Sequence, residues 1–502
     1  MRYGGNAMRD EAGHSIVLTG ATGFLGAFLM AGLLERGYHV TVLGRSSKDM
    51  GLPDRLSGLV RWFGIADRVE RLCALEADFS KRHLGLDDAA YGRLCAATVK
   101  IIHCASDTGF AERNRARVMA TNVNSLPALL DLAADARADH LYYVSTAYAA
   151  GMREGICMET PLTTDCFTNV YEESKAQAET IIGRYCENRG VPLSILRPSI
   201  VYGHSKTGIA LKFNALYYPV KSVLYIRDIF VKDIVEQGGE RSRRWGVSLG
   251  DDGILYLPLA VYLPNRGSVN LIPVDYFVES ALSIIEHSGS GGVYHITSDN
   301  PPDMTTLFEY AERFLGVRGI RALWDPSGKN PAPNPAEELF DRFIEQYRPY
   351  LSDRRIFDRS RMESITPGLS APPFTYDIFE RCMAYAVACD WGKKVGSPNV
   401  GGLARTPELA LSKGGLPDPT WNGETDRGSW SDRERSSGPD SGSHTSDSPG
   451  YLDRRCDPEP LRVQLTPGEH AGAVGYLPFR RELAAGGLRR GAPAVGNHEG
   501  QK

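Results

Sequence analysis

The chain has 502 residues, and 42% of them are hydrophobic, which is enough for a substantial core. Its 57 lysines and arginines nearly balance 61 aspartates and glutamates, so the formal charge of -4 gives no electrostatic reason to expect a nucleic-acid partner. The nine cysteines are odd in number and lack C-x-x-C spacing, which suggests neither a disulfide framework nor a zinc site and fits a reducing cytoplasm.

Residues 1–14 are polar and contain no apolar core of signal-peptide length, so we predict a disordered N-terminus. No later apolar run approaches the length of a membrane span. We therefore expect a soluble, cytoplasmic protein without an integral membrane segment.

The segment from residue 14 to residue 45 predicts the opening of a parallel sheet. HSIVLTG is a short β-branched run, ATGFLG follows it, and AFLMAGLLERG has the apolar spacing of a buried helix that ends at Gly37. YHVTVLGR is typical of a second strand. This order of strand, glycine turn, helix and strand indicates an α/β fold with a doubly wound parallel sheet of the Rossmann type.

The same alternation continues as far as Gly203. Further strands are expected within residues 69–80, 99–107, 140–151 and 193–203, and helices within residues 122–137 and 170–190. These strands are apolar nearly throughout, which is typical of a sheet covered on both faces. We predict one NADP-binding Rossmann domain over residues 15–203.

After Gly203 the pattern loosens, and compact helix and strand signals return only from residue 269. We assign residues 204–395 to a smaller substrate-binding lobe interleaved with the Rossmann domain. From residue 396 to residue 502 the composition shifts to Gly, Pro, Ser, Asp and Arg without a sustained period. Such a stretch cannot bury enough apolar surface to offset its ordering entropy, so we predict a disordered, low-complexity tail.

The TGATGFLG segment combines the features of a dinucleotide-binding turn. Its first glycine permits a sharp turn after the strand, its second lets the backbone approach a pyrophosphate, and its third allows close helix packing. The N-terminus of the following helix offers free N–H groups and a positive dipole to an anion. We predict that the turn binds the cofactor through Gly20, Thr22, Gly23, Phe24, Leu25 and Gly26.

The end of the second predicted strand indicates which nicotinamide cofactor is used. A carboxylate there would hold the ribose 2′-hydroxyl of NAD, but the strand ends in VLGRSSK. Arg45, with Ser46 or Lys48, could pair instead with the 2′-phosphate of NADP through charge-assisted hydrogen bonds. The alternative is a solvated arginine at the end of a strand.

Tyr171 and Lys175 are four residues apart in a predicted helix. A carbonyl accepts hydride only if its oxygen receives a proton or a strong hydrogen bond, and a cation at i+4 would lower the pKa of a tyrosine that donates it. Ser145 and Thr146 follow a predicted strand, at the sheet edge where ligands of open α/β sheets bind. The alternative is an exposed helix pair. We expect three neighbouring carboxylates, Glu172, Glu173 and Glu179, to be surface charges.

Taken together, the motifs identify a resemblance to a known superfamily. TGATGFLG, HCASDTGF, ATNV, VSTAYAAG, YEESK, RPSIVYG and LIPVDYFVESAL occur in the order seen in extended short-chain dehydrogenases/reductases. The match covers roughly residues 15–325. Within the superfamily the chain most resembles the male-sterility branch, which contains fatty acyl-CoA reductases and thioester reductase domains, on VSTAYAAG, RPSIVYGHSKTG, LIPVD, YRPYLSDRRIFD and FERCMAYAV.

The resemblance implies several site residues. The catalytic tetrad would be Asn122, Thr146 (or its neighbour Ser145), Tyr171 and Lys175. Asn122 would hold a water that links Lys175 to solvent, although a helix-capping or packing role is the alternative. The resemblance also places Asp78 near the adenine and the backbone of Cys104 and Ala105 along the cofactor. The Lys175 ammonium, next to Tyr171, could also hold the nicotinamide ribose. No metal is expected, because the sequence has no ligand cluster at metal spacing.

The function implied is an NADPH-dependent reductase of an acyl thioester, carried by CoA or by a carrier protein, or of a derived aldehyde. Two apolar inserts, residues 213–225 and 254–264, either line an acyl or pantetheine channel or pack as ordinary core. A sugar-nucleotide epimerase/dehydratase or a steroid-type dehydrogenase is the first alternative, because one fold serves many carbonyl chemistries. A non-catalytic NADP-binding regulatory protein is the second.

Overall fold

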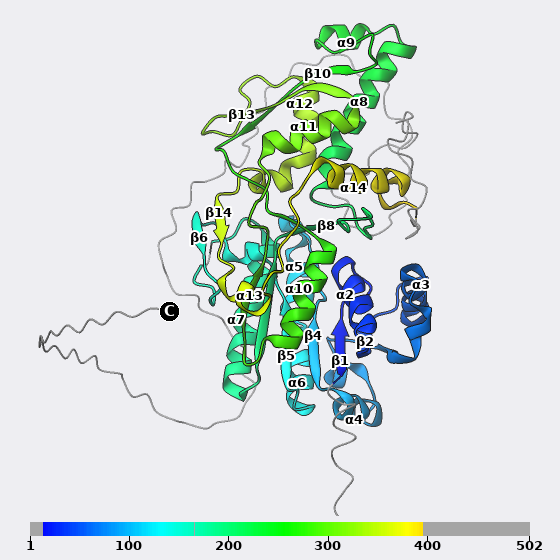
Figure 1. Ribbon diagram of the computed structural model, residues 1–502, viewed down its shortest axis with the longest axis vertical. Coiled ribbons are helices and arrows are strands. Elements are labelled where there is room, and N and C mark those ends of the chain that lie inside the picture. The colour runs from blue at the N-terminus through cyan, green and yellow to red at the C-terminus, as the bar shows by residue number, and fades with distance from the viewer. Residues whose placement is uncertain (1–13, 165, 395–502) are drawn as a thin grey trace, which may run out of the picture. The chain divides into compact units, whose positions relative to one another are not determined.

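The computed structural model describes residues 14–164 and 166–394, all within one compact unit (Figure 1). The predicted disorder of the N-terminus, apart from His14, and of the tail therefore lies outside the described residues. No helix within these two ranges combines the length and apolar character needed to cross a membrane.

Seven parallel strands form the central sheet, in the order β12-β7-β5-β4-β1-β2-β3. They are β1 (Ser15–Thr19), β2 (His39–Gly44), β3 (Leu72–Glu76), β4 (Lys100–His103), β5 (His140–Val144), β7 (Leu193–Pro198) and β12 (Gly291–Ile296). From β1 the chain builds outward first through β2 and β3, and then on the other side through β4 and β5. The predicted doubly wound parallel sheet is confirmed, with its switch point between β1 and β4.

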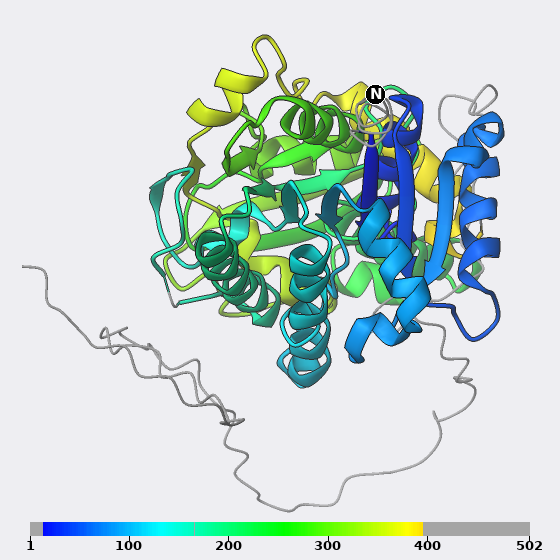
Figure 2. The ribbon, with the colours of Figure 1, turned by 90° about the horizontal axis from the view of Figure 1, so that it is seen from below.

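Helices cover both faces of this sheet, because alternate residues of each strand point to opposite sides. Ile16 and Leu18 join one core layer, and Val17 joins the other. The first layer is closed by α2 (Phe24–Glu35), α3 (Leu52–Phe63) and α10 (Val274–His287). The second is closed by α4 (Asp88–Ala97), α6 (Leu126–Asp135) and α7 (Val170–Arg189), and Figure 2 shows the strands between the helices.

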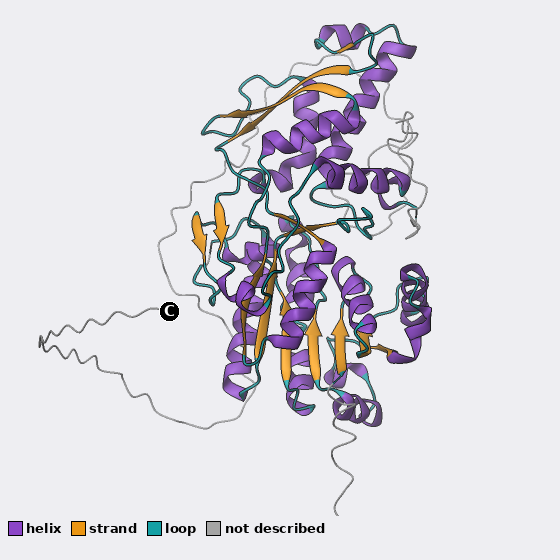
Figure 3. Cartoon of the chain, viewed as in Figure 1, coloured by secondary structure: helices purple, strands orange, loops and turns teal. Residues whose placement is uncertain are grey.

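A second lobe holds a separate core and a small sheet with the order β13-β10-β9 (Figure 3). Its strands are β9 (Ser248–Leu249), β10 (Leu255–Leu263) and β13 (Val317–Trp324), and its helices are α8 (Tyr217–Glu236), α9 (Glu240–Arg244), α11 (Met304–Leu315), α12 (Pro335–Ile344) and α14 (Tyr376–Ala388). Every second residue of β10 is buried, which is the period of a half-covered strand. The long helix α8 arises where the sequence pattern loosened.

The two lobes meet where the chain leaves the central sheet. The strand predicted over residues 193–203 is divided: β7 ends at Pro198 in the central sheet, and β8 (Ile200–Tyr202) pairs with β11 (Leu271–Pro273) instead. Although α10 and β12 follow residue 203, they belong to the central sheet and its cover. The predicted domain boundaries themselves stay predictions.

The remaining elements are short or lie at the edges of the layers. They are β6 (Gly155–Cys157), its parallel partner β14 (Arg355–Phe357), α5 (Arg115–Asn122), α13 (Ser360–Ile365), and the 3-10 turns η1 (Ala66–Arg71), η2 (Arg82–Gly85), η3 (Glu112–Asn114), η4 (Ala147–Ala150), η5 (Glu345–Tyr350) and η6 (Asp390–Gly392).

A buried ion pair fastens helix α7 to the sheet. Arg197 on β7 donates two hydrogen bonds to Glu179 on α7, at 3.0 and 2.6 Å, and both side chains are almost completely buried. Arg197 also lies 3.5 Å from Nε2 of His295 on β12. The prediction that Glu179 is a surface charge is wrong, because the arginine needed to pair it comes from a strand 18 residues away.

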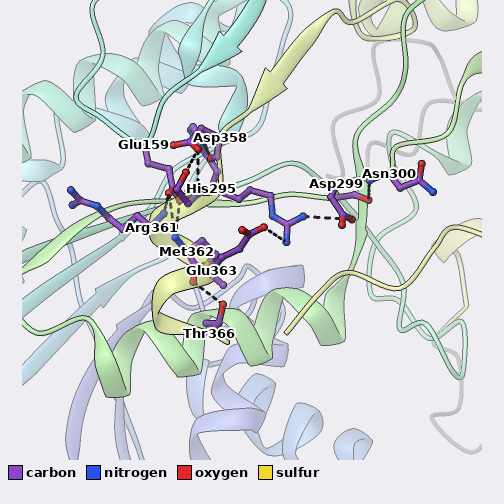
Figure 4. Close-up of polar contacts among 12 residues, drawn as sticks. Glu159, His295, Asp299, Asn300, Asp358, Arg361, Met362, Glu363 and Thr366 are labelled. Atoms are coloured by element: carbon purple, nitrogen blue, oxygen red, sulfur yellow. Dashed lines mark hydrogen bonds and ion pairs between the residues drawn. The ribbon is translucent and has the colours of Figure 1, made fainter. Parts of the chain in front are cut away.

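Beside this pair, a second buried carboxylate joins three segments. Glu159 accepts hydrogen bonds from the backbone N–H of His295 at 2.7 Å and of Arg361 at 2.6 Å, and a longer one from Met362 (Figure 4). Burial raises the pKa of Glu159, and these backbone donors oppose the shift. Because two of the donors open helix α13, Glu159 caps that helix from a distant loop and ties it to β12.

We expect the substitution Arg197→Leu to lower the free energy of unfolding by about 3–5 kcal/mol, because it leaves the Glu179 carboxylate buried and unpaired. Urea or guanidinium unfolding of the purified chain measures this change.

The matched control is Arg36→Leu, which breaks more exposed contacts of 2.9 Å with Glu286 and 2.6 Å with Glu279. It should cost no more than about 1 kcal/mol. Equal losses for the two variants would contradict the role assigned to the Glu179–Arg197 pair.

Candidate active site

The glycine turn after β1 is tightly packed against the turn after β4. Gly20 has a φ of +76°, and a Cβ added there would lie 2.6 Å from the Ala105 nitrogen. A Cβ at Gly26 would lie 2.2 Å from the Gly20 carbonyl oxygen. Both positions therefore require glycine. The close packing predicted at Gly26 is a contact with the Gly20 turn.

The turn leaves the N-terminus of helix α2 open to an anion. Gly23 is the N-cap residue, no described side chain caps the helix, and its first turn has no acidic residue. The free N–H groups and the helix dipole suit a pyrophosphate. The residues present thus fit a dinucleotide, and Thr22, Phe24 and Leu25 are partly exposed at this end of the helix.

Thr19 joins this turn to the loop after β4. Its hydroxyl oxygen accepts hydrogen bonds from the backbone of Cys104 and Ala105, at 3.2 and 3.1 Å, and lies 2.8 Å from Nδ1 of His103. Burial lowers the pKa of His103 to about 3, so its ring is neutral at physiological pH. The structure thereby brings Gly20, Cys104 and Ala105 together at the switch point. Burial also raises the pKa of the Cys104 thiol to about 11, which disfavours a nucleophilic thiolate.

The end of β2 places Arg45 beside a carboxylate that sequence reasoning missed. Arg45 is exposed, and its carbonyl accepts a hydrogen bond of 3.0 Å from Arg55 on α3. The strand register sets Gly44 opposite Glu76, and the Glu76 carboxylate accepts a hydrogen bond from the Ser46 hydroxyl. Only the pairing of β2 with β3 reveals this neighbour, because 30 residues separate Ser46 from Glu76.

Asp78 follows β3 by two residues. Its carboxylate accepts hydrogen bonds from the Ser80 backbone at 3.0 Å and from the Ser80 hydroxyl at 2.6 Å, and Lys81 lies 3.4 Å away. The bonds from Ser80 lower the pKa of Asp78. An ionised, partly exposed carboxylate therefore stands at the edge of the sheet that also carries the glycine turn.

Helix α7 carries Tyr171, the predicted proton donor, and Lys175, its predicted partner. Lys175 is buried, donates a hydrogen bond of 2.7 Å to the carbonyl of Val144 at the end of β5, and lies 4.8 Å from the Tyr143 ring centroid. Burial lowers the pKa of Lys175 to about 8. The ammonium group is thus fixed at the carboxyl end of β5, the strand that Ser145 and Thr146 follow.

The pKa of Tyr171 is raised, chiefly by burial and then by the nearby Cys104 and Glu172; a hydrogen bond with Thr146 opposes the shift. The prediction of a lowered pKa is wrong for this arrangement, because burial of the Tyr171 hydroxyl outweighs the opposing hydrogen bond. At neutral pH Tyr171 keeps its proton, which is the form that a proton donor needs.

Two neighbouring hydroxyls differ in what they contact. Thr146 hydrogen-bonds with Tyr171, and its oxygen also lies 3.4 Å from the Pro198 carbonyl and accepts a bond of 3.3 Å from the Tyr148 backbone. The Ser145 hydroxyl is buried and has no hydrogen-bond partner among the described residues. Of the two, Thr146 is therefore the one placed beside Tyr171.

Asn122 ends helix α5 and links the loop after β4 to α7. Its oxygen accepts a hydrogen bond of 2.7 Å from the Asp107 backbone, and its nitrogen donates to the Asp107 carbonyl at 2.8 Å and to the Ser174 hydroxyl at 2.9 Å. Ser174 in turn donates to the Tyr171 carbonyl at 2.8 Å. Asn122 thus joins the loop after β4 to helix α7, and its proposed water link to Lys175 stays a prediction.

Glu172, beside the candidate acid, is fully buried, so its prediction as a surface charge is wrong. Its carboxylate accepts a hydrogen bond of 2.6 Å from the Tyr350 hydroxyl and one of 2.9 Å from the Thr168 backbone. Glu173 is partly buried and paired with Arg115 at 2.8 Å. Tyr350 was missed because it approaches α7 from a distant part of the chain.

An apolar cavity of about 70 Å³, partly open to solvent, lies in the second lobe close to this site. Its walls come from the first apolar insert and α8, from α11, and from η5; they include Leu216, Val223, Phe308, Tyr347 and Tyr350. The second insert forms β10, which does not line this cavity and packs in the lobe core instead. The ring of Phe110 stands between the cavity and the acid, 5.7 Å from Tyr350 and 5.8 Å from Tyr171.

Comparison with known proteins gives one family and a consistent group of relatives. The family model described as male sterility protein matches residues 18–281, more than half of the chain. The nonribosomal peptide synthetase asaC of Aspergillus flavus is 24% identical over 317 residues, covering 60% of this chain and 27% of the relative. The aldehyde reductase lnaA of the same organism is 26% identical over 412 residues, covering 75% of this chain and 36% of the relative. The chain thus spans about a third or less of these relatives.

Two solved structures share the fold. The terminal R domain from the myxalamid PKS-NRPS pathway has a TM-score of 0.58 at 23% identity, covering 76% of this chain and 92% of that domain. A thiolation-reductase di-domain from an archaeal nonribosomal peptide synthetase has a TM-score of 0.54 at 16% identity, covering 76% of each chain.

Proposed function

The chain belongs to the male sterility protein family, and on that premise we propose that it is an NADPH-dependent reductase of an acyl thioester or of the derived aldehyde. The predicted family is confirmed, and with it the class, a nicotinamide-dependent oxidoreductase of the extended short-chain type. One observation carries the proposal: Tyr171 hydrogen-bonds with Thr146, and Lys175 of the same helix is held on the Val144 carbonyl at the sheet edge, close to an apolar cavity.

The chain's own residues would act on the substrate oxygen. Bound NADPH supplies the hydride that goes to the carbonyl carbon. Tyr171 donates its proton to the oxygen as negative charge develops there, and Thr146 holds that hydroxyl in place. The charged Lys175, held on the Val144 carbonyl, would bind the nicotinamide ribose of the cofactor. For a thioester, release of the thiol then leaves the aldehyde.

The cavity and the relatives support an acyl group as the substrate. Walls of leucine, valine and phenylalanine side chains favour a hydrocarbon chain and offer little to a sugar nucleotide. Delivery of that chain on a carrier protein is supported by the similar fold of a reductase joined to a thiolation domain. We propose carrier-bound and CoA-bound thioesters as the two forms to test.

Replacing Tyr171 with phenylalanine should reduce turnover of the acyl substrate by about 10²–10⁴-fold, because the substrate oxygen loses its proton donor. The Kd for NADPH should stay within about twofold of the parent value, because the substitution removes one hydroxyl group. Oxidation of NADPH is followed by its absorbance, with acyl-CoAs, acyl-carrier thioesters, aldehydes and nucleotide sugars as substrates.

Tyr185→Phe is the control, since it removes a tyrosine hydroxyl from the same helix, where it donates to the Leu130 carbonyl. Undiminished turnover by Tyr171→Phe would refute the acid. Conversion of nucleotide sugars, without turnover of any thioester or aldehyde, would refute the reductase.

The rate should fall above about pH 8, because Lys175, whose pKa burial lowers to about 8, is charged below that pH and neutral above it. Lys175→Arg should move this falling limb to higher pH, since an arginine keeps its charge. A pH profile of kcat/KM for both forms makes the comparison, and a falling limb at the same pH in both would contradict the assignment to Lys175.

Arg45→Ser should weaken NADPH binding by about 10-fold or more, because a charge-assisted contact to the 2′-phosphate is lost. Binding of NADH should be unchanged. Glu76→Gln should strengthen NADPH binding, since it removes a negative charge near that phosphate. Fluorescence titration gives the Kd values, and equal affinity of the parent protein for both cofactors would remove Arg45 from the proposal.

A further inference from the structure

Tyr350 completes the cap of the helix that carries the candidate acid. The side chain of the N-cap residue Asn169 accepts a hydrogen bond from the Glu172 backbone at 3.1 Å, which is an ordinary cap. Asn169 also donates to the Tyr350 hydroxyl at 2.6 Å, and that hydroxyl donates to the Glu172 carboxylate at 2.6 Å. Tyr350, a residue of η5, is therefore hydrogen-bonded to the first turn of α7, which contains Tyr171.

The same tyrosine forms part of the cavity wall. Its ring borders the apolar cavity and packs 5.0 Å from the Tyr148 ring and 5.7 Å from the Phe110 ring. Phe110 in turn packs 5.8 Å from Tyr171. One side chain thus has its ring against the space proposed for the acyl chain and its hydroxyl on the catalytic helix.

We propose that Tyr350 is a positioning residue, whose ring responds to an acyl chain in the cavity and whose hydroxyl sets the first turn of α7 and hence the place of Tyr171. This inference rests on the proposed function. Its physical basis is that Glu172 is fully buried and that Tyr350 is the donor to one of its oxygens. Without that donor, one oxygen of the buried carboxylate loses its hydrogen bond while the Thr168 backbone still holds the other, and we expect the turn to shift.

A small shift of that turn would matter because proton transfer needs close alignment. Displacements of about 1 Å can lower a rate by two orders of magnitude. Binding energy from the remote end of a substrate can be used to enforce such alignment, and it then raises kcat. We therefore expect kcat to rise with acyl chain length in the parent protein.

The test compares butyryl and dodecanoyl thioesters in the parent protein and in Tyr350→Phe, which keeps the ring and removes the hydroxyl. In the parent, kcat for the long chain should exceed that for the short chain by about fivefold or more. In Tyr350→Phe this ratio should fall to about one, whereas the preference of KM for the long chain should remain, because the cavity wall is intact. A merely structural role would lower both rates alike.

A second readout needs no substrate. Amide hydrogen exchange in the first turn of α7 should become faster in Tyr350→Phe, with exchange in β1 unchanged. Tyr185→Phe, on the same helix, should alter neither the kcat ratio nor this exchange. If Tyr350→Phe does not fold, Glu172→Met removes the acceptor in place of the donor and should give the same two changes.

The outcomes separate the inference from the function on which it rests. Suppose that the parent protein reduces thioesters and that Tyr171→Phe does not. If Tyr350→Phe then has the same kcat ratio and the same rate of hydrogen exchange as the parent protein, the inference about Tyr350 is overturned and the proposed function stands. The inference is also overturned if the kcat of the parent protein does not depend on the length of the acyl chain. If the parent reduces no thioester or aldehyde, the proposed function falls, and faster exchange in Tyr350→Phe would still establish the link between Tyr350 and α7.

Discussion

The buried ion pair between Glu179 and Arg197 fixes the helix on which the whole site is built. Arg197 lies on β7 in the middle of one half of the sheet, so α7 can take only one position against the strands. Two turns before Glu179, the same helix presents Tyr171, and one turn before it Lys175. Because the charges are buried, any tilt of α7 would separate them at a high energetic cost.

Around this pair, polar contacts link elements that are far apart in the chain. His295 on β12 lies 3.5 Å from Arg197, and its Nδ1 lies 2.7 Å from the Asp358 carbonyl, while Glu159 caps α13. The segment that contains Asp358 and α13 is thereby anchored on the sheet. Tyr350 precedes this segment in the chain and reaches the catalytic helix through its hydrogen bond to Glu172.

Local patterns allowed much of the fold and part of the site to be predicted. The glycine turn is encoded within eight residues, and the strands of a sheet covered on both faces are continuous apolar runs, so both can be recognised without tertiary contacts. The failures share a cause. Helix α8 packs against both α12 and α9, which blurs its apolar period. The strand predicted over residues 193–203 divides because β8 pairs with β11.

By itself, the sequence determined the doubly wound sheet, the position of the glycine turn and the placement of Tyr171 and Lys175 on one helix, because each depends on residues close together in the chain. The tertiary structure decided the electrostatics. It buried Glu172 and Glu179, which sequence alone placed on the surface, and it directed Lys175 at the Val144 carbonyl. The reason is that the state of a charge depends on its partners and on its access to water, and both are supplied here by segments up to 178 residues away.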